Sequence, residues 1–212
     1  MVSTPVLHYI YDPLCGWCYG AAPLVAAARD IVTVRPHGGG MMAGAGRQNV
    51  TPQLRDYVMQ HDRRIAALTG QVFGDAYFNG LLRDSAAVFD SEPPIAAILA
   101  AETLGGRGLD MIHHLQLAHY VEGRRVAEPE TLLGTAETIG LDPAAFAGAL
   151  ATQSGEAVQR HIGETRQFMR HIGANGFPSF VLARGKNLLL LDFTPYLGRP
   201  DALQDCLRSA MQ

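Results

Sequence analysis

The sequence predicts an α/β fold in which a β-α-β unit and a C-terminal β-β-α unit flank a long helical block. Three observations support this prediction. A run of β-branched and aromatic residues at 6–11 comes directly before an alanine-rich stretch at 19–28. Helix start and stop signals recur between residues 51 and 172, and two apolar runs around a turn follow at 179–193. With 212 residues, the chain is long enough for a hydrophobic core of its own.

Charge and hydropathy exclude several classes of protein. The net charge is −3, and charged residues make up 17% of the chain without runs of one sign, so we expect no nucleic-acid partner. No apolar run reaches the length of about 18–20 residues that a membrane-spanning helix needs, so we expect no membrane partner. The first residues do not form a signal peptide, which predicts a cytoplasmic protein if the sequence is complete, although a trimmed leader would leave the same start.

Two cysteines, Cys15 and Cys18, lie where the strand at 6–11 gives way to a helix. The chain has three cysteines, a number and spacing that fit one redox pair and one unpaired cysteine better than a disulfide scaffold. Free backbone N–H groups and partial positive charge at a helix start favour a thiolate, so Cys15 is the predicted nucleophile and the more exposed thiol. Residues three apart on a helix are close enough for Cys18 to close a disulfide after a small adjustment. Pro13 prevents an earlier helix start.

The segment after this helix is predicted to complete the β-α-β unit. Residues 31–36 form a short β-branched run, which we expect Pro36 to end. The glycine-rich stretch at 38–46 is predicted to be a loop, and its glycines do not follow the spacing of a phosphate-binding loop. Met41 and Met42 in this loop fit either a substrate groove or core packing.

The middle of the chain is predicted to be helical. Thr51 and Gly70 bound the first helix. Its apolar face is expected to contain Leu54, Tyr57, Val58, Ile65 and Leu68. Further helices are expected at 92–104, at 109–121, at 129–139, from residue 143, and from 154 to 172. We therefore expect a discontinuous domain of residues 1–50 and 173–212, with residues 51–172 as an inserted all-helical domain.

The C-terminal part is predicted to form a hairpin and a closing helix. Two apolar runs flank a turn at 184–187. Residues 202–211 have the pattern of a short amphipathic helix. Cys206 shares its apolar face with Leu203 and Leu207, which favours a small buried hydrophobic residue over a third redox thiol.

This layout resembles the thioredoxin fold with a helical insertion, as in the DsbA family, and within that family the FrnE-like cytoplasmic branch. The resemblance covers nearly the entire chain. It is carried by Cys15-Gly16-Trp17-Cys18 after a strand, by Pro23 where thioredoxin-like helices kink, and by Gly176-Phe177-Pro178-Ser179-Phe180 before the hairpin. Similar segments also occur at 117–125 and 141–146. The resemblance implies that Pro178 is a cis proline packed against the cysteine pair, and that the backbone before it pairs with a substrate strand.

The function that follows from this resemblance is thiol–disulfide exchange on protein substrates by a protein-disulfide oxidoreductase or isomerase. Cys15 attacks a substrate disulfide and Cys18 resolves the mixed disulfide. Trp17, Phe177 and Pro178 are expected to bind the substrate, which is a protein thiol or disulfide or glutathione. The Gly-Trp dipeptide is closer to the dipeptides of disulfide isomerases than to the Pro-His of strongly oxidising relatives.

No metal and no cofactor are expected. The cysteine pair lacks a second Cys or His pair at zinc spacing. His113, His114 and His119 do not complete a metal site, because the first two point to different helix faces. His8, at a strand position, is interpreted as a structural residue.

Two other functions stay open at this point. Kappa-class glutathione transferases and 2-hydroxychromene-2-carboxylate isomerases share the inserted-helix architecture but carry a serine in place of the redox pair. In that hypothesis, Cys15 stands in for the serine in a glutathione-dependent reaction of a small aromatic compound. A binding or chaperone module with a vestigial pair is the third hypothesis. No oligomeric state is predicted.

Overall fold

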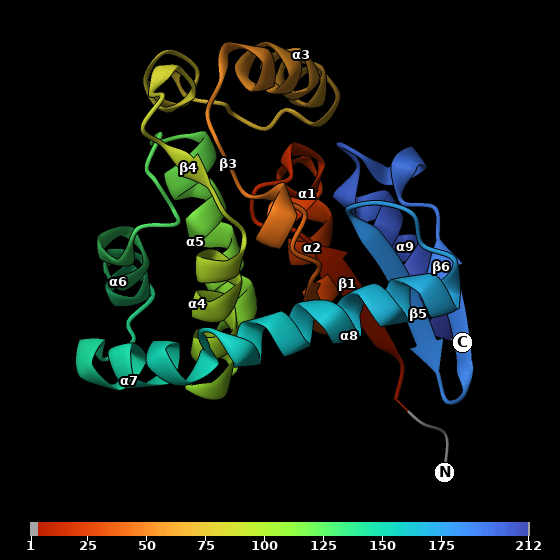
Figure 1. Ribbon diagram of the computed structural model, residues 1–212. Helices are drawn as coiled ribbons and strands as arrows, with labels where there is room; N and C mark the ends of the chain where they lie inside the picture. The colour runs from red at the N-terminus through yellow and green to blue at the C-terminus, as the bar shows by residue number, and fades with distance from the viewer. Residues whose placement is uncertain (1–3, 212) are drawn as a thin grey trace.

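A mixed four-stranded sheet forms the centre of the computed structural model, which describes residues 4–211 (Figure 1). The strand order is β2-β1-β5-β6. Strand β1 (Val6–Tyr11) pairs in parallel with β2 (Thr33–Gly38) and antiparallel with β5 (Ser179–Arg184). Strand β5 pairs antiparallel with β6 (Asn187–Leu191). The predicted α/β class, with its β-α-β and β-β-α units, is confirmed.

Helices cover both faces of this sheet. The helix after β1 is broken at Ala21 into α1 (Gly16–Gly20) and α2 (Ala22–Arg29), with a proline in the first turn of α2. Helix α2 packs against α9 (Pro200–Met211) on one face. Helix α8 (Glu156–Ile172) crosses the other face, as Figure 1 shows. The break in the helix matches the kink expected at Pro23.

The segment between β2 and β5 is mostly helical, as predicted. The first helix begins and ends at the predicted capping residues. The Thr51 side chain accepts a hydrogen bond from the Leu54 N–H at 3.1 Å, and Gly70 ends the helix in the left-handed conformation. The helices before α8 are α3 (Pro52–Thr69), α4 (Glu92–Thr103), α5 (Gly108–Tyr120), α6 (Pro129–Thr138) and α7 (Pro143–Gln153). No helix within residues 4–211 is long and apolar enough to cross a membrane.

Two expectations about strands are wrong. Strand β2 does not end at Pro36 but continues to Gly38, with Pro36 opposite Tyr9. Because β2 is the edge strand, a proline there can leave its missing N–H on the open side. The predicted helical block also contains a short strand, β4 (Val88–Phe89), which pairs with β3 (Gln48–Asn49).

The expected apolar face of α3 is only partly covered. Ile65 is fully buried, but Tyr57 and Leu68 are exposed. Helix α3 packs mainly on the short helix α1, which is too small to cover a broad stripe. The chain then passes through a π-helical turn at Ala76–Gly80 and a 3-10 turn at Leu81–Arg83, neither of which has a clear sequence pattern.

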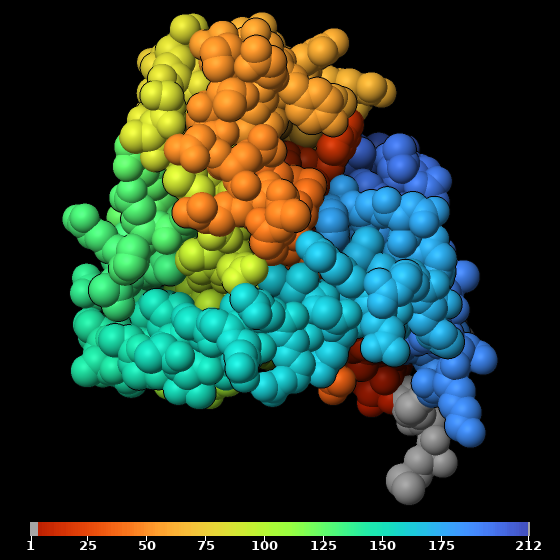
Figure 2. Space-filling view, in the orientation of Figure 1, coloured from red at the N-terminus to blue at the C-terminus, as the bar shows by residue number. Residues whose placement is uncertain are grey.

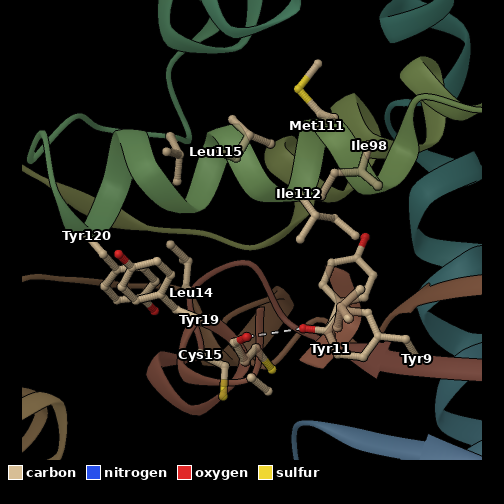
Figure 3. Close-up of a cluster of buried hydrophobic side chains, with 14 of the residues drawn as sticks. Tyr9, Tyr11, Leu14, Cys15, Tyr19, Ile98, Met111, Ile112, Leu115 and Tyr120 are labelled. Carbon is tan, nitrogen blue, oxygen red and sulfur yellow. Dashed lines mark hydrogen bonds between the residues drawn. The ribbon is translucent and has the colours of Figure 1, made fainter. Parts of the chain in front are cut away.

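The core joins the sheet to the helical block. Figure 3 shows Tyr9 and Tyr11 of β1 beside Ile112 of α5, with Leu115 farther along the same helix. Near α1, the red N-terminal segment reaches the surface in a narrow band between the orange segment that contains α3 and the blue C-terminal segment (Figure 2). The start of α1 therefore lies where the two parts of the molecule meet.

Candidate active site

The cysteine pair occupies the first turn of α1. Cys15 is the N-cap, with extended backbone angles (φ −94°, ψ 113°), and Cys18 lies within the helix. The Cys18 N–H donates to the Cys15 carbonyl oxygen at 2.9 Å, which holds the turn closed. Neither cysteine forms a disulfide. Cys15 is 6% exposed and Cys18 0%, so Cys15 is the thiol nearer to solvent.

The two thiols have different surroundings. Burial raises the pKa of the Cys18 thiol well above its ordinary value, and the neighbouring Cys15 raises it further. A backbone N–H from Asp12 reaches the Cys18 sulfur at 3.5 Å. Below it, the Tyr9 hydroxyl donates to the Cys18 carbonyl oxygen at 3.3 Å. Cys18 is therefore held as a protonated thiol beneath the outer cysteine.

A distant segment completes the site. The peptide bond between Phe177 and Pro178 is cis. The Cys15 thiol donates to the Phe177 carbonyl oxygen at 3.6 Å, across 162 positions of sequence. The Phe177 ring lies against Gly39, where an added Cβ would come within 2.1 Å of it. The fold thus places the Phe177-Pro178 segment, which the family resemblance associates with the cysteine pair, beside the Cys15 thiol.

Trp17 lies between the two cysteines in sequence and is half-buried. The Arg64 guanidinium of α3 lies 6.0 Å from the centre of its ring, within cation–π range. The indole therefore lies beside α3 of the inserted helical segment.

The Asp12 side chain connects three segments of the chain by hydrogen bonds. Its buried carboxylate accepts hydrogen bonds from the Leu14 N–H and the Ser91 hydroxyl, both at 2.9 Å, and from the Met41 N–H at 2.5 Å. Burial raises its pKa, and these hydrogen bonds oppose that shift. Asp12 therefore fixes the end of β1, the glycine-rich loop and the start of α4 around the site.

A second buried acid, Asp62 of α3, was missed by the sequence analysis. Its carboxyl lies so close to Gly16 that a Cβ there would come within 2.2 Å of Oδ1. The Tyr77 hydroxyl donates to Asp62 Oδ2 at 2.8 Å. Burial raises the pKa of Asp62 to about 7, with the Tyr77 hydrogen bond opposing the shift. The signal that could have identified it is its position between Val58 and Ile65 on the expected apolar face.

His8, His37 and His119 pack against other aromatic side chains. His8 Nδ1 and His37 Nε2 lie 2.8 Å apart and share a hydrogen bond. His119 is buried against the rings of Tyr77, Phe89 and Tyr120. Within residues 4–211, the His, Cys, Asp and Glu side chains form no group of three that could hold a metal ion.

An outer thiol at a helix start, above a buried partner thiol three residues later, is suited to exchange with disulfides. The sheet order and the segment before β5 bring a backbone carbonyl to that outer thiol. Together, the fold and the site define a thiol–disulfide oxidoreductase with a thioredoxin-like domain.

Residues 6–207 match the family model of the DSBA-like thioredoxin domain, and the chain belongs to this family. It is similar to the cytosolic disulfide reductase DsbM from Pseudomonas aeruginosa, with 53% identity, a TM-score of 0.92, and coverage of 97% of this chain and 98% of that chain. A structure of the same protein with GSH gives 51% identity, a TM-score of 0.91 and the same coverage. These findings confirm the predicted DsbA-family membership and oxidoreductase class.

A more distant likeness is to 2-hydroxychromene-2-carboxylate isomerase, with 16% identity and a TM-score of 0.59 over 97% of this chain and 98% of that chain. At this identity, the likeness shows the shared fold alone. No curated protein matches the sequence at a significant level.

Proposed function

We propose that this protein reduces disulfide bonds within proteins or mixed disulfides that contain glutathione, with Cys15 as the nucleophile and Cys18 as the resolving thiol. The observation that carries the proposal is the asymmetry of the pair. Cys15 is the outer thiol and touches the Phe177 carbonyl, whereas Cys18 is fully buried with a raised pKa. The reductive direction and a cytosolic location are supported by the similarity to a cytosolic disulfide reductase.

In the first step, the Cys15 thiolate attacks one sulfur of the substrate disulfide. The substrate S–S bond breaks, a mixed disulfide forms at Cys15, and the leaving thiolate takes up a proton. Cys18 then loses its proton and attacks the Cys15 sulfur, which releases the second substrate thiol. The substrate gains two electrons, and the enzyme is left with a Cys15–Cys18 disulfide.

A thiol reductant must return this disulfide to the dithiol. We propose glutathione for this role: two molecules donate one electron each and leave as glutathione disulfide. The glutathione complex of a protein 51% identical to this chain supports a thiol of this class at the site. Phe177, whose carbonyl oxygen contacts Cys15, and Trp17, which lies two residues after Cys15 in the chain, are proposed to contact the substrate, with Pro178 supporting the backbone beside Cys15.

The test is reduction of insulin by the purified protein with glutathione as the reductant. We expect the wild-type protein to accelerate the reaction and Cys15→Ser to abolish the acceleration. Cys206→Ser is the matched control, because Cys206 lies in α9 outside the pair and its loss leaves both reactive thiols in place. Full activity in Cys15→Ser, or equal loss in Cys206→Ser, would contradict the proposal.

A further inference from the structure

Strand β6 leaves a row of leucines at the open edge of the sheet. Strand β5 is its neighbour on one side, and residues 4–211 place no strand on the other (Figure 1). Leu188, Leu189 and Leu190 are 41%, 57% and 42% exposed. Edge strands in natural proteins are normally protected by charges, prolines or bulges, because open backbone groups pair with other chains. Between Asn187 and Leu191, strand β6 carries no charge and no proline.

The exposed leucines extend the core on both faces of the sheet. Leu189 lies opposite Leu182 of β5, and Leu190 lies opposite Val181. Leu182 and Val181 are buried in separate core clusters, one on each face. A helix docked from outside would cover one face, whereas an added strand continues both. An added strand is therefore the kind of partner that fits the edge of β6.

We propose that two copies of this chain associate through their β6 strands, antiparallel about a twofold axis at Leu189. Two four-stranded sheets would then form one continuous sheet of eight strands. Leu189 would face the partner's Leu189, and Leu188 would face the partner's Leu190. Residues 188 and 190 share the same backbone orientation along the strand, so both can take part in the same antiparallel ladder.

The charges that flank β6 fit this register. Lys186, in the turn before β6, and Asp192, directly after β6, each lie three positions from Leu189, so the flexible Lys186 side chain would come within reach of the partner's Asp192 at both ends of the strand pair. Both residues are exposed, and neither forms a salt bridge within residues 4–211. Opposite charges across a strand pair stabilise it. A register centred on Leu188 would instead place Lys186 opposite the partner's Leu190.

Light scattering after size-exclusion chromatography, at several micromolar concentrations, tests the association. We expect a dimer for the wild-type protein and a monomer for Leu189→Asp, because two aspartates would meet on the axis. The matched control is Leu104→Asp, another exposed leucine at the end of α4, which should stay dimeric. Insulin reduction by Leu189→Asp verifies its fold. A monomeric wild-type protein, or a dimer that survives Leu189→Asp, would overturn the proposal.

Carbodiimide cross-linking tests the register. Lys186 is the only lysine in the sequence, so an amide between its Nζ and the partner's Asp192 carboxyl gives one defined cross-linked peptide. The carbodiimide takes up the water lost as the amide forms. Lys186→Asp and Asp192→Lys should each weaken the dimer, and the double variant should restore it. Cross-links from Lys186 to other carboxyls, or a failure of the double variant to recover the dimer, would show that the register is wrong.

Discussion

The Asp62 carboxyl of α3 lies directly on Gly16, inside the tetrapeptide that carries both cysteines. An added Cβ at Gly16 would come within 2.2 Å of Asp62 Oδ1, and one at Gly20 within 2.6 Å of the Ile65 side chain. The two glycines lie four positions apart on the same side of α1, which lets α3 approach the helix closely. Close packing of α3 against α1 therefore requires a glycine at position 16.

Replacing Gly16 with Ala is therefore expected to lower the free energy of unfolding by about 1–3 kcal/mol, since the added methyl group overlaps Asp62. Urea denaturation measures the change. In the Asp62→Ala background, the same substitution should cost much less, because the overlapping carboxyl is gone. The control is Gly148→Ala in α7, where an added Cβ meets nothing within 4 Å. Equal costs of Gly16→Ala in both backgrounds would contradict the packing explanation.

The raised pKa of Asp62 predicts a pH dependence of stability. In the folded protein, the carboxyl keeps its proton up to about pH 7, whereas its ordinary pKa is 3.8. The folded state thus binds more protons than the unfolded chain between these values, so the contribution of Asp62 to stability is lost as the pH rises through 7. The difference between these two pKa values corresponds to about 4 kcal/mol.

Asp62→Asn removes this titration. The unfolding free energy of the variant minus that of the wild-type protein should rise between pH 4 and 7 and then level off. The difference is the quantity to measure, because burial lowers the pKa of His37 to about 4 and of His119 to about 3, and both histidines act in the opposite direction in this range. A difference that stays constant with pH would show that folding leaves the pKa of Asp62 unchanged.

Cys18→Ser should trap a mixed disulfide at Cys15. Because the proposed resolving thiol is absent in this variant, attack on glutathione disulfide stops after the first exchange. Peptide mapping by mass spectrometry should place a glutathione adduct on Cys15. The Cys15→Ser variant should carry no adduct in the tetrapeptide, because the remaining Cys18 is fully buried. An adduct at Cys18 would reverse the assigned roles.

Gly39→Ala tests the position of Phe177. The added Cβ would come within 2.1 Å of the Phe177 ring, so the segment beside Cys15 must move. We expect insulin reduction to fall by about 10- to 100-fold, since a misplacement of about 1 Å has effects of this size. The matched control is Gly163→Ala in α8, where an added Cβ has open space. Unchanged activity in Gly39→Ala would show that the position of Phe177 does not limit exchange.

The sequence by itself determined the features that depend on neighbouring residues. The caps at Thr51 and Gly70, the hairpin before α9 and the thiol pair at a helix start all follow from local backbone preferences. The link between Cys15 and the Phe177-Pro178 segment came from the family resemblance, because local pattern carries no information about residues 162 positions apart.

Tertiary structure alone decided the rest. Pro36 continues a strand because β2 lies at the sheet edge, and Tyr57 stays exposed because α3 rests on a short helix. The pKa of Asp62 rises because packing against Gly16 removes its carboxyl from water. Each outcome depends on which distant surface covers a residue, and such coverage is a property of the assembled fold rather than of the local sequence.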